Sequence, residues 1–179
     1  LELASMGKVP LADELLGSWE IVPNPHSTSQ AERSAALVDL GFGKRFSDHM
    51  AHATWTAERG WHDFRIEPYE AIAMSPAGAV LHYGQEVFEG LKAYRHAGSI
   101  WTFRPTYNAA RLNHSSRRLA IPEFEHEAFI GSIVNLVRQD AAWVPDAPGS
   151  SLYLRPFIFA SEAFLGVRAS HRYEYMVVA

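Results

Sequence analysis

Apolar and polar residues alternate along several stretches of the chain, which is the pattern of half-buried β-strands. In residues 50–56 (MAHATWT), Met50, His52 and the threonines fall on one face, and Ala51, Ala53 and Trp55 fall on the other. A turn at 58–60 leads to a second predicted strand at 61–69, which Pro68 interrupts. Further on, LKAYR and SIWTFR are two β-rich runs joined by His96–Gly98, and together they predict a hairpin.

Two later segments have a helical period. Residues 104–121 place Pro105 at a first helical position and carry a sparse apolar stripe. Residues 125–143 combine a broad apolar face with glutamates near the start, and predict the clearest helix of the chain. A short helix is predicted over Gln30 to Leu40, a loop at 74–81, and strands at 151–159 and 173–179.

This order of elements indicates an α+β fold, an antiparallel or mixed β-sheet with helices packed on one side. We expect residues 1–41 to form a partly extended lead-in, because breaker residues interrupt them, and residues 42–179 to form one small domain. The chain stops at Ala179 inside a predicted apolar strand. We therefore expect a piece of a longer protein.

Composition excludes several classes of function. The net charge of −4, without a basic run, argues against nucleic acid, and no apolar run is long enough for a membrane span. The absence of cysteine excludes disulfides and thiol catalysis and suits a cytoplasmic location. The nine histidines are scattered, and His49 and His52 bring no further ligands at metal-binding spacing, so we expect no metal site.

Three side chains stand out as candidates for anion recognition. Arg111, early in a predicted helix, is suited to gripping a phosphate, although a solvated helix-face arginine is the default interpretation. Tyr153 and Arg155 share one face of a strand whose other face is apolar. They suit carboxylate recognition in a mostly apolar pocket; a cross-strand ion pair at a sheet surface is the alternative.

The stretch LHYGQEVFEGLKAYR (81–95) is unusually rich in polar groups beside aromatics. Tyr83 and Phe88 either line an apolar pocket or, as the favoured interpretation, belong to the core. Glu86 and Glu89 lie three residues apart on different faces, which favours structural roles over an acid–base pair. Lys92 is a tempting Schiff-base nucleophile, but its hairpin should reach solvent, so a surface lysine is favoured.

Six motifs in register give this chain a resemblance to a known family. They are FSDHM, ERGWHDFRIEPYE, LHYGQEVFEGLKAYR, FRPTYNAARLNHSSRRLAIP, AWVPDAPGSSLYLRPFIF and FLGV. From about Phe42 onward the chain resembles the N-terminal small domain of branched-chain amino acid aminotransferases, which are pyridoxal-phosphate enzymes of fold type IV. D-Amino acid aminotransferases and aminodeoxychorismate lyases are alternatives that YLRP and the long VFEGLKAYR argue against. A non-catalytic binding or dimerisation module is a third.

The resemblance implies roles for individual residues. Arg111 matches the arginine that holds the cofactor phosphate. The positions that match substrate-binding residues are Tyr83, Phe88, Gly90, Tyr153 and Arg155. Leu165, Gly166 and Val167 match a loop that reaches the site of a partner subunit, which implies a homodimer.

The family also implies pyridoxal 5′-phosphate as cofactor and a ping-pong transfer from leucine, isoleucine or valine to 2-oxoglutarate, with glutamate and the 2-oxo acids as the other reactants. The family places its Schiff-base lysine in the second domain, and none of Lys8, Lys44 and Lys92 stands in a matching context. We therefore expect no catalytic nucleophile within this chain, no activity and no firmly bound cofactor when it is isolated.

Overall fold

The computed structural model describes residues 19–38 and 40–179. Expectations for residues 1–18, including the first part of the lead-in and Lys8, lie outside the described residues. The division into a lead-in and a small domain stays a prediction.

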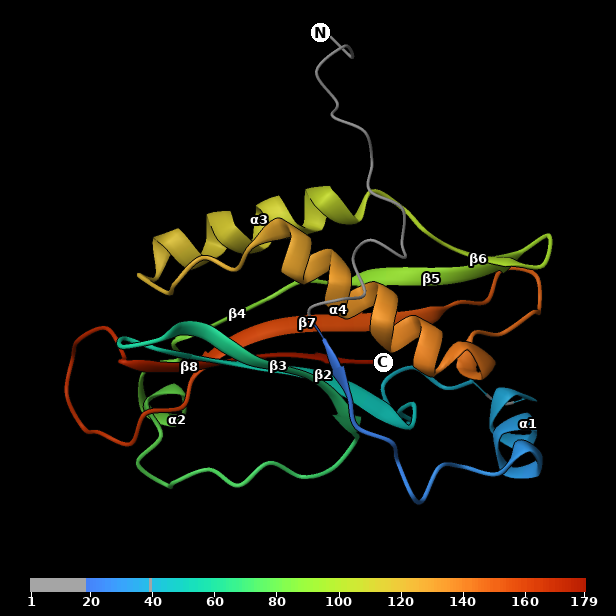
Figure 1. Cartoon of the computed structure of the whole chain (residues 1–179), viewed down its shortest axis with the longest axis horizontal. Coiled ribbons are helices and arrows are strands. Elements are labelled where there is room, and N and C mark those ends of the chain that lie inside the picture. The colour runs from blue at the N-terminus through green and yellow to red at the C-terminus, as the bar shows by residue number, and fades with distance from the viewer. Residues whose placement is uncertain (1–18, 39) are drawn as a thin grey trace, which may run out of the picture.

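An eight-stranded mixed sheet forms the body of the molecule (Figure 1). Its strands are β1 Glu20–Ile21, β2 His49–Thr56, β3 Gly60–Pro68, β4 Glu86–Phe88, β5 Leu91–His96, β6 Ser99–Thr102, β7 Leu152–Ala160 and β8 Arg172–Val178. Their order is β1-β3-β2-β8-β7-β5-β6, and β4 also pairs with β7, so β4 and β5 follow one another along the same neighbour. The β1–β3 pair is parallel and the other pairs are antiparallel. The predicted strands and the β5–β6 hairpin are confirmed; β1 and β4 were not predicted.

The helices are α1 Gln30–Val38, α2 Ala79–Tyr83, α3 Pro105–Arg118 and α4 His126–Gln139, followed by a 3₁₀ turn, η3, at Ala141–Trp143. Helices α3 and α4 lie together on one face of the sheet, as predicted, and α2 lies on the other side (Figure 1). The predicted loop at 74–81 was wrong from Ala79 onward. The buried Ala79 donates its N–H to the carbonyl of Glu162 at 2.9 Å, and this distant contact stabilises a helical turn that local sequence does not signal.

The core fills the space between α3, α4 and the sheet. Tyr175 of β8 is fully buried and stacks on Phe124, with ring centroids 3.8 Å apart. Its hydroxyl forms a 2.8 Å hydrogen bond with Ser132 of α4, and burial raises the pKa of Tyr175. The aromatic layer therefore joins the last strand to the helical layer.

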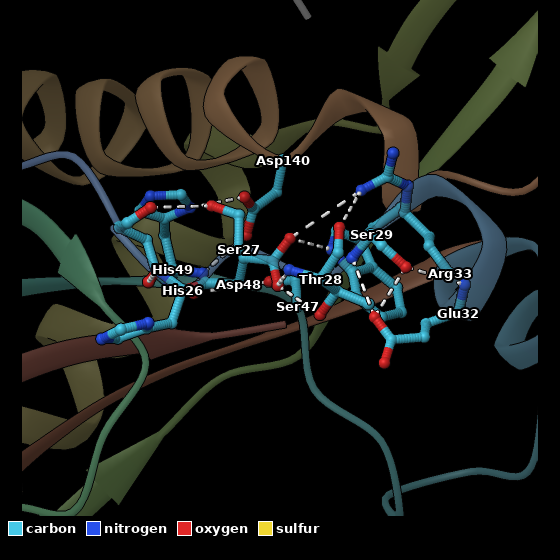
Figure 2. Close-up of polar contacts among 12 residues, drawn as sticks. His26, Ser27, Thr28, Ser29, Glu32, Arg33, Ser47, Asp48, His49 and Asp140 are labelled. Atoms are coloured by element: carbon cyan, nitrogen blue, oxygen red, sulfur yellow. Dashed lines mark hydrogen bonds and ion pairs between the residues drawn. The ribbon is translucent and has the colours of Figure 1, made fainter.

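The segment before β2 packs on the domain through two anchors. Trp19 is 5% exposed and packs edge-on against Phe64 of β3. Asp48 accepts hydrogen bonds from the N–H and hydroxyl of Thr28 at 2.9 and 2.6 Å, as Figure 2 shows. Trp19 and Thr28, which belong to the predicted lead-in, thus contact residues of the predicted small domain.

The face of the sheet opposite α3 and α4 carries a charged network centred on His52. Its ring nitrogens lie 2.7 Å from Glu67 and 3.1 Å from Glu174, which also accepts a hydrogen bond from Thr54. Burial alone lowers the pKa of His52, but the hydrogen bonds and charges of the two glutamates outweigh it and raise the pKa to about 9. His52 is therefore a cation at neutral pH, held between two carboxylates.

This raised pKa predicts a loss of stability at alkaline pH. His52 contributes its full stabilisation below the unfolded-state pKa of about 6.5, and the contribution disappears as the pH rises through 9, a loss on the order of 2–3 kcal/mol. Urea unfolding of the wild type and of His52→Gln between pH 6 and 10 measures this loss of stability. Subtracting one free energy of unfolding from the other at each pH cancels the titration of groups that both proteins share. His96→Gln, at an exposed hairpin position, is the matched control and should follow the wild-type curve. A wild-type minus His52→Gln difference that does not change with pH would contradict the assignment.

Candidate functional site

Strand β7 presents Tyr153 and Arg155 on the face of the sheet opposite α3 and α4. The residues between and after them, Leu154 and Pro156, are buried on the helical face. The Arg155 Nη2 and Nε donate to the Tyr153 hydroxyl at 3.0 and 3.2 Å. Within residues 19–38 and 40–179, Arg155 forms no ion pair, so the predicted alternative of a cross-strand ion pair is not what the structure shows.

Phe88 and Gly90, at the junction of β4 and β5, complete this group. The Arg155 guanidinium lies over the Phe88 ring at 4.4 Å from the centroid. Gly90 lies directly against the Tyr153 hydroxyl: a Cβ at position 90 would be 2.3 Å from that oxygen. Phe88 is 58% exposed, so the prediction that it belongs to the core was wrong. We call Phe88, Gly90, Tyr153 and Arg155 the arginine–aromatic cluster.

Phe42 is a site residue that sequence reasoning missed. Its ring packs edge-on against Tyr153, with centroids 5.0 Å apart. Both rings line a largely apolar cavity of about 450 Å³ between α1, the loop after it and the start of β7. The available signal was an aromatic side chain between two glycines, Gly41 and Gly43, since such a ring is presented by a turn rather than buried in a regular element.

Arg111 of α3 reaches the edge of the sheet beside this cluster. Its Nε donates to the carboxylate of Glu89 at 2.9 Å. Among the described residues, neither of its terminal amino groups has a hydrogen-bond partner, and the side chain is 57% exposed. Arg111 is therefore an oriented guanidinium whose outer donors remain available to an oxyanion.

Tyr83 lies elsewhere, with the loop between β7 and β8. Its ring stacks on Phe164 at 6.3 Å, and in the described part of the chain it forms no ring contact with Phe88. The same loop exposes Leu165 by 72% and Val167 by 95%, with Gly166 between them. In the described residues, Tyr83 thus forms its aromatic contact beside the predicted partner loop.

This loop is ordered by Glu162 at its base. Both terminal nitrogens of Arg168 donate to the Glu162 carboxylate, at 3.0 and 2.7 Å, and the His171 N–H donates at 2.6 Å. The hydrogen bonds from Arg168 and from the His171 amide lower the pKa of Glu162 to about 2. The ion pair therefore persists at any physiological pH and presents Leu165 and Val167 on a fixed frame.

The described residues supply neither a buried amine nor a metal centre. Lys92, the β-partner of Tyr153, is exposed, and so is Lys44. No group of three or more histidine, aspartate or glutamate side chains in the described ranges is arranged to hold a metal ion. No helix in this part of the chain has the length and apolar character that crossing a bilayer requires. The arrangement therefore offers anion recognition and apolar contact.

Comparisons with known proteins identify relatives of this chain. The branched-chain-amino-acid aminotransferase of Mycolicibacterium smegmatis is 52% identical over 163 residues, covering 90% of this chain and 44% of the relative. A probable branched-chain-amino-acid aminotransferase of Streptomyces coelicolor is 51% identical over 162 residues, covering 89% and 45%. The chain thus spans less than half the length of the curated relatives that it matches. No protein-family model matches it.

Among solved structures, a branched-chain amino acid aminotransferase complexed with N-(5′-phosphopyridoxyl)-L-glutamate is 29% identical to this chain. The match has a TM-score of 0.52 and covers 72% of this chain and 40% of that one. The sheet with helices on one side is therefore an architecture that solved aminotransferase structures share, as the α+β prediction required.

Proposed function

We propose, from the membership of this chain in the branched-chain aminotransferase family, that it forms one wall of the active site of a pyridoxal-phosphate enzyme. The whole enzyme moves the amino group of leucine, isoleucine or valine to 2-oxoglutarate in the cytoplasm. Pyridoxal phosphate, when bound, supplies an electron sink for the substrate carbon that loses its proton. We place the amine that anchors the cofactor in a part of the whole enzyme that lies outside this chain.

The observation that carries the proposal is the state of Arg111. A phosphate needs charged donors in a planar fork, and the terminal amino groups of Arg111 are oriented and accessible while its Nε is already engaged by Glu89. The residues present therefore fit the phosphate end of the cofactor. Lys92 and Lys44 are both exposed to solvent.

The arginine–aromatic cluster suits a pocket with two kinds of substrate. Phe88 and Phe42 offer aromatic surface beside the apolar cavity, which suits branched aliphatic side chains. Arg155 carries a charge with no carboxylate partner in the described ranges, and Tyr153 fixes its direction. The second carboxylate of glutamate or 2-oxoglutarate supplies that missing partner.

The loop of Leu165, Gly166 and Val167 supports a homodimer. An ordered loop that exposes two aliphatic side chains on a braced frame is suited to burial against another subunit. Tyr83 packs on the same loop through Phe164, so we place Tyr83 with the residues offered to the partner's site rather than with Phe88.

Binding of phosphate tests the proposal directly. Isothermal titration of the complete protein, freed of cofactor, with pyridoxamine 5′-phosphate and with pyridoxamine should show tighter binding of the phosphorylated compound. Arg111→Gln should reduce this preference about 10- to 100-fold, because charge-assisted hydrogen bonds to the phosphate are lost. Arg118→Gln, an exposed arginine at the end of the same helix, is the matched control and should leave the preference unchanged. Equal binding of both compounds by the wild type would refute the phosphate role.

A further inference from the structure

Glu89 is a buried carboxylate, 3% exposed, and both of its oxygens are occupied by side chains of α3. Oε1 accepts from Arg111 Nε at 2.9 Å, and Oε2 accepts from Asn108 Nδ2 at 2.9 Å. We infer that Glu89, assisted by Asn108, is a positioning residue that turns the free end of Arg111 toward the cofactor phosphate. This inference rests on the proposed function and adds to it the group that orients the phosphate-binding arginine.

The backbone of Glu89 is itself fixed to the strand that carries the substrate side chains. Its N–H donates to the carbonyl of Pro156 in β7 at 2.8 Å. Asn108 Nδ2 also lies 3.2 Å from the carbonyl of Gly90, the residue against which Tyr153 packs. Glu89 therefore joins three parts of the site: α3 with Arg111, the β4–β5 junction, and strand β7.

The geometry at Arg111 gives this link a direct consequence. A long arginine side chain samples many rotamers, and a hydrogen bond at Nε restricts its stem while leaving the planar fork of terminal amino groups outside. A buried carboxylate is suited to this task because its desolvation makes it hold a cationic partner firmly. The arginine is thus oriented before any phosphate arrives, which reduces the entropy that binding must overcome.

The charge of Glu89 acts in the opposite direction. A carboxylate beside Arg111 repels an incoming phosphate, so electrostatics alone predicts that removing this charge tightens phosphate binding. A positioning role predicts weaker phosphate binding instead. Glutamate has two acceptor oxygens, one for Arg111 and one for Asn108, whereas glutamine has only one. The sign of the change in phosphate affinity therefore separates electrostatic repulsion from positioning. If Glu89 only attaches α3 to the sheet, the substitution should leave the affinity for either probe unchanged.

The test compares Glu89→Gln with Glu86→Gln, in which an exposed glutamate of β4, three residues before Glu89, serves as matched control. The variants are made in the complete protein, freed of cofactor; the probes are pyridoxamine 5′-phosphate and pyridoxamine, and the readouts are affinity by titration calorimetry and thermal stability. Glu89→Gln should bind the phosphorylated probe about 10-fold more weakly and pyridoxamine unchanged, because orientation is lost only for the phosphate contact. Equal or tighter binding of the phosphorylated probe by a folded Glu89→Gln protein overturns the inference.

Two further variants keep the result interpretable. If Glu89→Gln does not fold, Asn108→Ala removes one hydrogen bond to Glu89 and keeps the ion pair with Arg111. This variant should bind the phosphorylated probe several-fold more weakly, and unchanged binding overturns the inference. Arg111→Gln distinguishes the phosphate role of Arg111 from the positioning role of Glu89. If it binds both probes like the wild type, the phosphate role of Arg111 fails and the inference falls with it. If it loses the phosphate preference while Glu89→Gln keeps it, only the positioning role of Glu89 is wrong.

Discussion

Replacing Asp140 with alanine is expected to lower the free energy of unfolding by about 3 kcal/mol, because it leaves two buried polar groups of His49 without their partner. Asp140 directly follows α4 and His49 begins β2, and both side chains are about 3% exposed or less. The Asp140 carboxylate accepts from the His49 N–H at 2.9 Å and lies 2.7 Å from the ring Nδ1 (Figure 2). This contact thus joins the C-terminal end of α4 to the start of β2.

Urea unfolding followed by tryptophan fluorescence measures the effect. Asp140→Asn keeps an acceptor for the backbone N–H and should cost less than half as much as alanine. Asp146→Ala is the matched control: Asp146 is 84% exposed and pairs with Arg95 at 3.0 Å, so its loss should change stability by under about 1 kcal/mol. If Asp140→Ala and Asp146→Ala lower stability equally, the buried pair does not have the proposed weight.

Local patterns in the sequence predicted the elements whose two faces differ. Strand β2 alternates alanines of the main core, Ala51 and Ala53, with polar residues of the opposite face such as His52, and α4 has a wide apolar face, so each element carries its own evidence of two different faces. The sequence did not predict β1, β4 or α2. Each is five residues or shorter and forms through a distant partner, such as the Ala79 N–H bound to Glu162, so no local period marks it.

The candidate site divides in the same way. Alternation placed Tyr153 and Arg155 on one face, and the resemblance named Arg111, Phe88 and Gly90, which the structure brings to one edge of the sheet. Neither alternation nor the resemblance predicted side-chain contacts between residues far apart in the sequence. The sequence favoured a structural role for Glu89 but did not indicate its hydrogen-bonded ion pair with Arg111, 22 residues away.

Such contacts depend on strand register and helix placement. The pairing of β4 with β7 sets which side chains at the β4–β5 junction face α3 and which face Tyr153. A shift of one residue exchanges the two faces, so residue types and spacing alone do not determine them. Glu89 and Gly90 are adjacent in sequence and serve opposite faces of the sheet for this reason.

Replacing Gly90 with alanine is expected to lower activity strongly while leaving the fold intact. Under the proposed function, we expect kcat/KM of the complete protein for 2-oxoglutarate to fall about 100-fold, because a displacement of about 1 Å at a substrate-orienting group can have that effect. The added Cβ would lie 2.3 Å from the Tyr153 hydroxyl and 3.0 Å from its ring carbon Cζ, so the ring must move. Tyr153 then no longer holds Arg155 in place, and the loss should be larger for 2-oxoglutarate than for a branched 2-oxo acid. Unfolding free energy should change by less than about 1 kcal/mol, since the displaced atoms are the end of a side chain.

A double-mutant cycle with Tyr153→Phe identifies the cause. Phenylalanine removes the oxygen that the new methyl group meets, so Gly90→Ala should cost several-fold less in the Tyr153→Phe background than in the wild type. Additive effects would mean that the methyl group acts on something other than Tyr153. A Gly90→Ala enzyme with wild-type kcat/KM would mean that the Tyr153–Arg155 pair tolerates displacement and does not set the recognition of the second carboxylate. The close approach of Gly90 to Tyr153 therefore gives the clearest link between the backbone at the β4–β5 junction and substrate selection.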